Sequence, residues 1–129
     1  GIFKNGALLA HQLSDQLREI SNLEVIKVDV KMDKKNPKHS VETNFPIKNF
    51  ANKSIVIVDD VLNTGSTLIH AVNYFLKIPV KQLQTAVMVN RNHKKYPIKA
   101  DFKGISLSTT LKEHVHVEIQ GVETGVYLT

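Results

Sequence analysis

The sequence predicts an α/β fold, with a parallel β-sheet flanked by helices and a ligand bound at the carboxyl ends of the strands. The main observation is the unbroken apolar run at residues 55–58, which is typical of a strand buried on both faces of a parallel sheet. Two carboxylates and a polar turn follow, and then apolar residues recur at the spacing of one helix face: Leu68, Val72 and Phe75. Other predicted strands alternate with helices, which supports the same architecture.

The chain opens with a short loop and an amphipathic helix. Residues 1–6 are typical of a functional loop, but no strand stands before them to position it, so we expect further residues upstream of Gly1. Over residues 7–20 the apolar side chains fall on one face of a helix, namely Leu8, Leu9, Leu13, Leu17 and Ile20.

The pattern of residues 23–30 predicts a strand. Residues 31–50 then show no regular spacing of apolar side chains. This second segment holds Pro37, Pro46 and five lysines, which indicates a long exposed loop. Loops of this length are unusual inside a compact domain and tend to be functional.

After the central helix, residues 82–89 predict the next strand, residues 90–97 a polar turn and residues 101–107 a short irregular segment. Residues 115–119 alternate between apolar and polar side chains, as do residues 126–128, so a small hairpin is expected at the end. We expect one domain over residues 1–129.

The composition limits the function classes. The chain has no cysteine, which excludes disulfides and thiolate metal sites and is compatible with a cytoplasmic location. No apolar run approaches the roughly 20 residues that span a bilayer, and no signal peptide pattern stands at the start, so no membrane partner is expected. The net charge of +5 favours polyanionic ligands.

The central motif offers two kinds of polar group side by side. Asp59 and Asp60 end the apolar run, and residues 64–67 read Thr-Gly-Ser-Thr at the start of the helix. Free backbone N–H groups at a helix start, together with the hydroxyls, form a phosphate site. Acids that hold hydroxyls beside a phosphate site suit a ribose 5-phosphate.

Two other nucleotide-binding motifs fail on the sequence. A strand ending in two acids also occurs in P-loop ATPases, but the only candidate for their first motif, residues 1–6, continues with Ala7 and Leu8 and lacks the lysine and the hydroxyl. A dinucleotide-binding G-x-G-x-x-G is absent from the sequence.

Residues 55–67 resemble the 13-residue signature of the type I phosphoribosyltransferases, which bind phosphoribosyl pyrophosphate (PRPP). The resemblance implies that Asp59 and Asp60 are the catalytic pair, that they hold the ribose hydroxyls, and that they hold Mg²⁺ indirectly through substrate or water. It implies that the loop binds the 5-phosphate, which gives a PRPP-binding set of Asp59, Asp60, Val61, Leu62, Asn63, Thr64, Gly65, Ser66 and Thr67.

Two further segments match loops of that family. Residues 1–6 stand where the family has its pyrophosphate loop, which often holds a non-proline cis peptide and would here consist of Phe3, Lys4, Asn5 and Gly6. Residues 31–50 stand where the family has a mobile flap that closes over the reacting centre and shields it from water.

Residues 83–93 and 96–104 are similar to the PyrR branch, the bifunctional pyrimidine-operon attenuators with uracil phosphoribosyltransferase activity. The features shared are an Arg-x-His turn at residues 91–93, Pro-Ile-x-Ala-Asp at residues 97–101 and Gly104. The branch implies PRPP and a nucleobase, most simply uracil, as substrates, UMP and pyrophosphate as products, and a homo-oligomer. The nucleobase-binding set is Asn90, Arg91, Phe102 and Lys103.

Three positions point away from 6-oxopurines. Purine relatives carry an Asp, a Lys and an Asp where this chain has Asn63, Asn90 and Thr109, and Asn63 also replaces an aromatic residue usual in the PyrR branch. A purine phosphoribosyltransferase remains an alternative. The other alternative is an RNA-binding regulator of pyrimidine genes with little catalysis, whose phosphate contacts would be Lys94, Lys95, Lys99 and Lys103.

The histidines leave two interpretations open. His93 in the Arg-x-His turn contacts pyrophosphate or base, or is a plain turn residue. His114 and His116 are expected to be exposed strand residues, because two histidines without a nearby third ligand are weak evidence for a metal.

Overall fold

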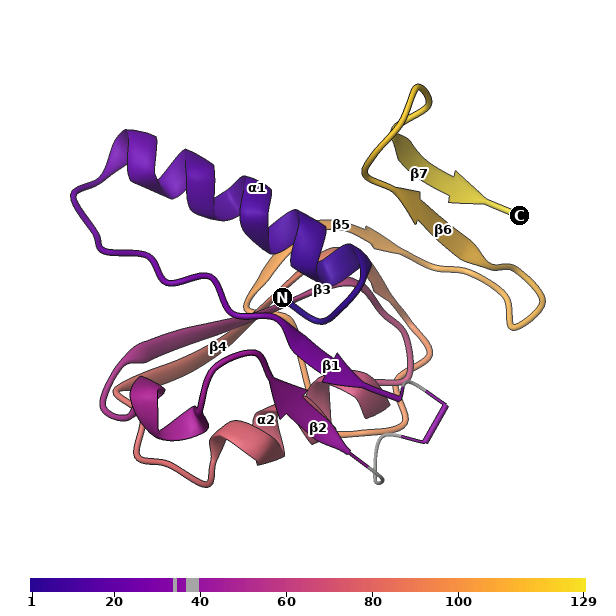
Figure 1. The fold of residues 1–129 in the computed structure, drawn as a ribbon. Helices are drawn as coiled ribbons and strands as arrows, with labels where there is room; N and C mark the ends of the chain where they lie inside the picture. The colour runs from indigo at the N-terminus through magenta and orange to yellow at the C-terminus, as the bar shows by residue number, and fades with distance from the viewer. Residues whose placement is uncertain (34, 37–39) are drawn as a thin grey trace.

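The structure, a computed structural model, describes residues 1–33, 35–36 and 40–129. Its centre is a parallel three-stranded sheet in the order β3-β4-β5, formed by β3 (Ser54–Leu62), β4 (Gln82–Arg91) and β5 (Phe102–Leu107) (Figure 1). Two helices accompany it, α1 (Asn5–Ile20) and α2 (Ser66–Phe75). The predicted α/β class with a parallel sheet is confirmed, as are both predicted helices.

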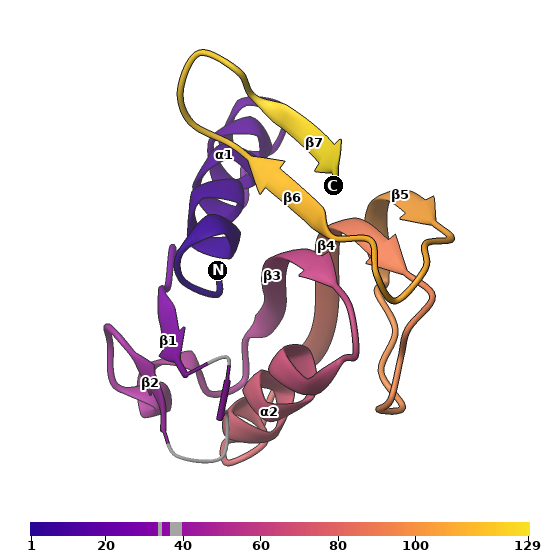
Figure 2. The same cartoon turned by 90° about the vertical axis from the view of Figure 1, so that its right-hand side faces the viewer.

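The two helices cover opposite faces of β3, as Figure 2 shows. Successive strand residues point to opposite faces, and Ile57 packs with Leu68 and Phe75 of α2, whereas Val58 packs with Leu9 of α1. The doubly buried apolar run therefore fixes β3 between the helices, which is what positions its polar end.

The first residues of the chain extend the sheet beside β3. The Ile2 amide donates to the Val58 carbonyl at 2.8 Å, and Ile2 forms a parallel bridge with Val30. On the other side the Phe3 amide donates to the Val30 carbonyl at 2.8 Å, and the Val30 amide to the Gly1 carbonyl at 2.9 Å. Residues 1–3 thus lie between β3 and β1 (Val30–Met32).

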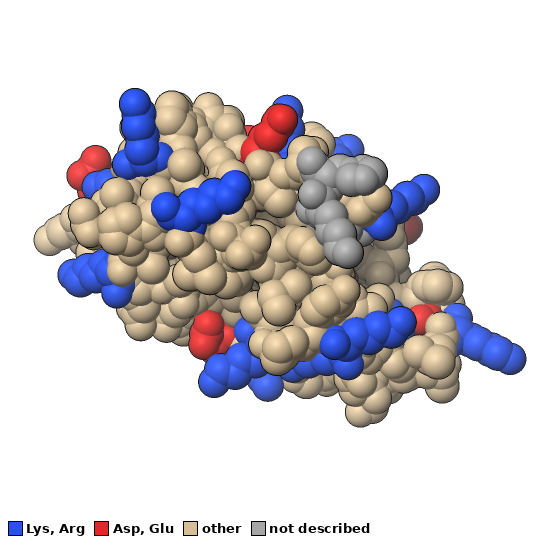
Figure 3. All heavy atoms as spheres, turned by 90° about the horizontal axis from the view of Figure 1, so that it is seen from below, with Lys and Arg blue, Asp and Glu red and all other residues tan. Residues whose placement is uncertain are grey.

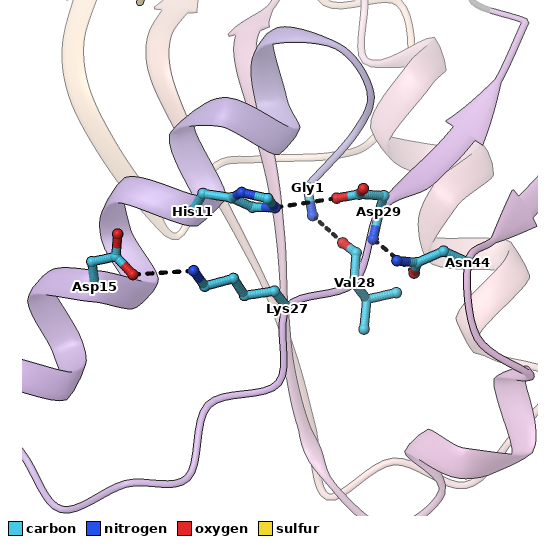
Figure 4. Close-up of polar contacts among 7 residues, drawn as sticks. All are labelled: Gly1, His11, Asp15, Lys27, Val28, Asp29 and Asn44. Carbon is cyan, nitrogen blue, oxygen red and sulfur yellow. Dashed lines mark hydrogen bonds and ion pairs between the residues drawn. The ribbon is translucent and has the colours of Figure 1, made fainter.

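The strand predicted at residues 23–30 is wrong except at Val30. Side chains hold this segment instead: Lys27 Nζ lies 3.1 Å from Asp15 Oδ1, and His11 Nε2 lies 3.5 Å from Asp29 Oδ1 (Figure 4). The physical reason is that no described strand pairs with residues 23–29, and Leu23 and Ile26 are 66% and 48% exposed.

The long loop predicted at residues 31–50 is also wrong in part. β1 pairs antiparallel with β2 (Val41–Thr43), and a 3₁₀ helix, η1 (Ile47–Phe50), follows. The cause is tertiary packing, because Phe50 is buried against Phe75 with ring centroids 6.3 Å apart. Residues 34 and 37–39 of the predicted loop, which include Pro37, lie outside the described residues.

Residues 101–107 were predicted to be irregular, but Phe102–Leu107 form β5, parallel to β4. β5 forms because its backbone pairs with β4. Its own side chains are largely exposed and carry no apolar pattern, and Phe102 is 54% exposed. The predicted terminal hairpin is confirmed: β6 (Val115–Glu118) pairs antiparallel with β7 (Gly125–Leu128). This hairpin lies beside α1 in both ribbon views (Figures 1 and 2).

Candidate functional site

Asp59 and Asp60 lie inside β3, near its carboxyl end, because the strand continues to Leu62. Asp59 is 2% exposed, and its Oδ1 accepts a hydrogen bond from the Asp60 amide at 2.9 Å. Asp60 is half-buried, and its Oδ1 accepts from the Val61 amide at 2.8 Å. Local backbone contacts therefore fix one oxygen of each carboxylate at the carboxyl edge of the sheet.

Asn5 ties three parts of the site together. Its Nδ2 donates to Asp60 Oδ2 at 3.1 Å and to the Val117 carbonyl of β6 at 3.0 Å. The sequence assigns Asn5 to the pyrophosphate loop, but nothing in the sequence indicates this link, which depends on the hairpin lying beside the start of α1.

The pyrophosphate loop expected from the resemblance lies against β3. A Cβ on Gly6 would stand 2.6 Å from the Val58 carbonyl oxygen and 3.0 Å from Asp59 Cα, so only glycine allows this approach. The peptide between Phe3 and Lys4 is cis, as the resemblance implies. Lys31 Nζ of β1 lies 5.5 Å from the centroid of the exposed Phe3 ring, and Lys4 is also exposed.

The predicted phosphate turn leads directly into α2. Gly65 is the N-cap, with a left-handed φ of 91° and no side-chain cap hydrogen bond, and Thr64 Oγ1 accepts from the Ser66 amide at 3.2 Å. The Ser66 amide is therefore occupied, and the lack of a cap from the N-cap residue itself leaves the following backbone N–H groups of the first turn for an anion. The Thr67 hydroxyl belongs to the same first turn.

The loop after β4 packs onto this turn, which the sequence does not indicate. The amides of Lys95 and Tyr96 donate to the Thr64 carbonyl at 2.8 and 3.2 Å. A Cβ on Gly65 would collide with the Ile98 side chain. The segment that resembles the PyrR branch therefore supports the turn that is expected to bind the 5-phosphate.

The predicted nucleobase set is divided by the strand register. Asn90 pairs with Ser106 at the carboxyl edge, whereas Phe102 pairs with Ala86, well below that edge. A hollow of about 300 Å³ lies at the ends of β4 and β5. Its lining includes residues that sequence reasoning missed, because β5 was not predicted; the lining is Asn90, Arg91, Asn92, Lys94, Ser106, Leu107 and Ser108.

Asn90 lines this hollow with a polar side chain, one atom of which is buried. Its Nδ2 donates to Ser106 Oγ at 3.4 Å, while its buried Oδ1 has no hydrogen-bond partner among the described residues. Buried polar atoms are usually satisfied. The neighbouring Arg91 is buried and its guanidinium contacts the loop at residues 109–113.

His93 and His116 each have a polar partner in the structure. His93 Nε2 lies 3.1 Å from Thr109 Oγ1, and the exposed His116 lies 3.0 Å from Glu118 Oε2. Within the described ranges, no three His, Cys, Asp or Glu side chains are grouped so that they could hold a metal ion. Asp59 and Asp60 offer carboxylate oxygens, the donors Mg²⁺ prefers, and Mg²⁺ usually keeps waters and substrate oxygens as further ligands.

Near the hollow, Glu113 has a perturbed acidity. The Thr110 amide donates to Glu113 Oε1 at 2.7 Å and, with smaller contributions from the Thr110 hydroxyl, Arg91 and His93, holds the pKa of Glu113 below its usual value.

In the described part of the chain, none of the helices has the length and apolar character needed to cross a bilayer.

Comparison with known proteins agrees with this geometry. A family model described as phosphoribosyl transferase domain matches residues 1–121. The chain is 30% identical over 122 residues to the bifunctional protein PyrR of Streptococcus agalactiae serotype Ia, covering 92% of this chain and 70% of that protein. It is 34% identical over 131 residues to the bifunctional protein PyrR of Limosilactobacillus reuteri, covering 93% of this chain and 73% of that protein.

Among solved structures, the hypoxanthine phosphoribosyltransferase of Trypanosoma cruzi superposes with a TM-score of 0.73 at 16% identity. The match covers 88% of this chain, which spans about three fifths (61%) of that structure. At this identity the likeness concerns the fold alone.

Proposed function

This chain belongs to the family of phosphoribosyl transferase domains, and we propose that it transfers ribose 5-phosphate from PRPP to a nucleobase. The observation that carries the proposal is the meeting of three segments at one sheet edge. The pyrophosphate loop touches β3 through Gly6, Asn5 reaches Asp60, and the uncapped start of α2 follows four residues after β3 ends.

In the proposed reaction, a nitrogen of the base attacks the anomeric carbon of PRPP and releases its proton to water. The bond from that carbon to the pyrophosphate oxygen breaks, and pyrophosphate leaves with the electron pair. Asp59 and Asp60 hold the ribose hydroxyls, residues 64–67 hold the 5-phosphate, and the backbone of residues 3–6, with Lys4, holds the leaving pyrophosphate. The protein's contribution is positioning and electrostatic stabilisation rather than covalent chemistry.

We propose Mg²⁺ as the cofactor because the site offers carboxylate oxygens beside a polyphosphate ligand. When bound, the ion would neutralise charge on the leaving pyrophosphate. Asp59 and Asp60 would hold it mainly through water and through the ribose hydroxyls that they orient.

Uracil is the base we favour. The Asn90 amide offers one donor and one acceptor, which complements the adjacent N–H and C=O groups of uracil. Asn90 lines the hollow, and its buried Oδ1 has no hydrogen-bond partner among the described residues, which supports this role. The same edge exists on 6-oxopurines, so a purine substrate remains the alternative, against which stand Asn63, Asn90 and Thr109.

A panel of bases tests the proposal. The protein is incubated with PRPP, Mg²⁺ and, separately, uracil, hypoxanthine, guanine or adenine, and the nucleotides are detected by chromatography. We expect UMP and pyrophosphate in equal amounts. Formation of IMP or GMP instead would overturn the choice of base, and absence of any nucleotide would overturn the transferase itself.

An RNA-binding role is the second candidate. Lys94, Lys95, Lys99 and Lys103 are all exposed, on the connection from β4 to β5 and on β5 itself. Figure 3 shows lysine and arginine side chains spread over one face of the molecule with few acidic groups among them. Such a surface also attracts RNA without specificity, so charge alone does not decide.

RNA specificity is measured by comparing a pyrimidine-gene leader with a scrambled RNA at physiological salt. A specific regulator binds the leader at least about tenfold more tightly, and Lys94→Glu with Lys95→Glu weakens that binding without changing PRPP turnover. Equal affinities for the two RNAs would leave a plain salvage enzyme.

A homo-oligomer, which the resemblance implies, stays a prediction. Val56 and Phe102 are exposed apolar side chains of the sheet. Sedimentation of the purified protein gives the number of subunits directly.

A further inference from the structure

Arg91 ends β4 with a buried guanidinium that faces a single loop. Its Nε and Nη2 donate to Thr109 Oγ1 at 2.9 and 2.7 Å. Nη2 also donates to the carbonyls of Thr110 at 3.3 Å and Glu113 at 2.8 Å. All four contacts go to residues 109–113, the connection from β5 to the terminal hairpin.

The hydroxyl of Thr109 is shared between Arg91 and His93. A hydroxyl accepts at most two hydrogen bonds and donates one. Because Arg91 occupies both acceptor positions, the Thr109 proton is left for His93 Nε2, which lies 3.1 Å away. This hydrogen-bond pattern requires His93 Nε2 to be the acceptor, and the proton of the neutral ring then stands on Nδ1.

A second contact closes the arrangement from the backbone side. The Thr109 amide donates to Asn92 Oδ1 at 3.1 Å. The three consecutive residues 91–93, at the end of β4 and directly after it, thus contact both the side chain and the backbone of Thr109. We call Arg91, Asn92, His93 and Thr109 the clamp.

The clamp lies where the sheet ladder ends. The last residue pair between β4 and β5 is Arg91 with Leu107, and the strand pairing ends there. The hollow of about 300 Å³ has its two walls at this point, residues 90–92 and 94 on one side and residues 106–108 on the other. The clamp joins the ends of both walls, so it fixes their separation.

We propose that Arg91 is a positioning residue for the nucleobase: acting through Thr109, it sets the width of the hollow in which the base binds. This inference rests on the proposed transferase function and places the base beside Asn90. It gives Arg91 a different role from the direct base contact that the resemblance implies, since the Nε and Nη2 edge of the guanidinium faces the loop.

The test compares Thr109→Val, which removes the hydroxyl at nearly constant volume, with Thr109→Ser, which keeps it. We expect Thr109→Val to raise the KM for the base about tenfold or more while the KM for PRPP changes less than about twofold. Thr109→Ser should restore the base KM toward the wild-type value. Thr124→Val is the matched control, because Thr124 is exposed in the β6–β7 turn and its side chain makes no hydrogen bond within the described residues.

A merely structural clamp gives a different pattern. It would lower the melting temperature of Thr109→Val, or it would change kcat and both KM values together. Either result overturns the inference if the ratio of the base KM to the PRPP KM is unchanged. ¹⁵N chemical shifts of the His93 ring in the free wild-type protein provide a readout without turnover: a neutral ring with its proton on Nε2 contradicts the clamp geometry. Wild-type protein that forms no nucleotide contradicts the proposed function, whereas turnover with an unchanged base KM in Thr109→Val contradicts only the positioning role.

Discussion

The two acids at the sheet edge, Asp59 and Asp60, differ in exposure and in their contacts. Asp59 is buried, whereas Asp60 is half-exposed and receives Asn5. Because Asn5 also reaches the hairpin, Asp60 is the acid whose position depends on three segments at once. Asp60 is therefore the more informative residue to change.

Asp60→Asn should lower kcat/KM by about 100-fold or more while the melting temperature stays unchanged or rises. The remaining side-chain oxygen still accepts from the Val61 amide, but the hydrogen bond from Asn5 Nδ2 and the negative charge proposed to hold a ribose hydroxyl are both lost. Removing that charge also relieves repulsion with Asp59. Initial rates and thermal unfolding measure the two effects.

Asp101→Asn is the control for this prediction, with the same substitution at a structural carboxylate. Asp101 Oδ2 accepts from the Thr85 amide at 2.9 Å, away from the carboxyl edge. It should lower the melting temperature and leave the kcat of the folded protein intact. A reversed pattern, with Asp60→Asn fully active or strongly destabilised, would contradict the ribose-binding role.

Gly6→Ala should lower both stability and PRPP affinity. The added methyl group would meet backbone atoms of Val58 and Asp59, which cannot rotate away, so the loop must shift at a cost of about 1–3 kcal/mol. Calorimetric titration with PRPP and Mg²⁺ measures the affinity. Gly121→Ala, with φ of 104° and open space around it, should destabilise through its backbone alone and keep wild-type affinity; equal affinity loss in both variants would refute the contact.

At the scale of elements, the β1–β2 pair lies next to the loop that is expected to bind pyrophosphate. Val30 exchanges hydrogen bonds with residues 1–3, and Lys31 stands over the Phe3 ring. A ligand on that loop would therefore contact this pair. This agrees with the sequence-based expectation that residues 31–50 act as a flap, which stays a prediction.

PRPP with Mg²⁺ should protect residues 31–50 from trypsin. The expected change is slower cleavage after Lys31, Lys35 and Lys48, because the bound ligand would hold the segment over the site. Cleavage after Lys81 is the internal control and should stay constant, because this exposed residue stands directly before β4 and away from the carboxyl edge of the sheet. Unchanged cleavage at all of these lysines would argue against a flap.

For the whole molecule, the sequence predicted the parts whose patterns are local and missed those that depend on tertiary contacts. The apolar run of β3 and the spacing of α2 were sufficient for the central unit and for the acids at its edge. β5 could not be predicted, because its residues carry no apolar pattern and its pairing comes from β4. The hollow and the clamp were missed for the same reason, since Thr109 has meaning only once the register of β5 is known.

The central claim is that one edge of the sheet binds PRPP in two halves, with the 5-phosphate at the start of α2 and the pyrophosphate on residues 3–6, which lead into the first turn of α1. Titration of ¹⁵N-labelled protein, followed by backbone amide shifts in NMR, tests it most directly, with Mg²⁺ present throughout. We predict that ribose 5-phosphate shifts residues 64–67, that pyrophosphate shifts residues 3–6, and that PRPP shifts both groups. Shifts confined to the exposed lysines at 94, 95, 99 and 103, or the absence of shifts with PRPP, would contradict the account.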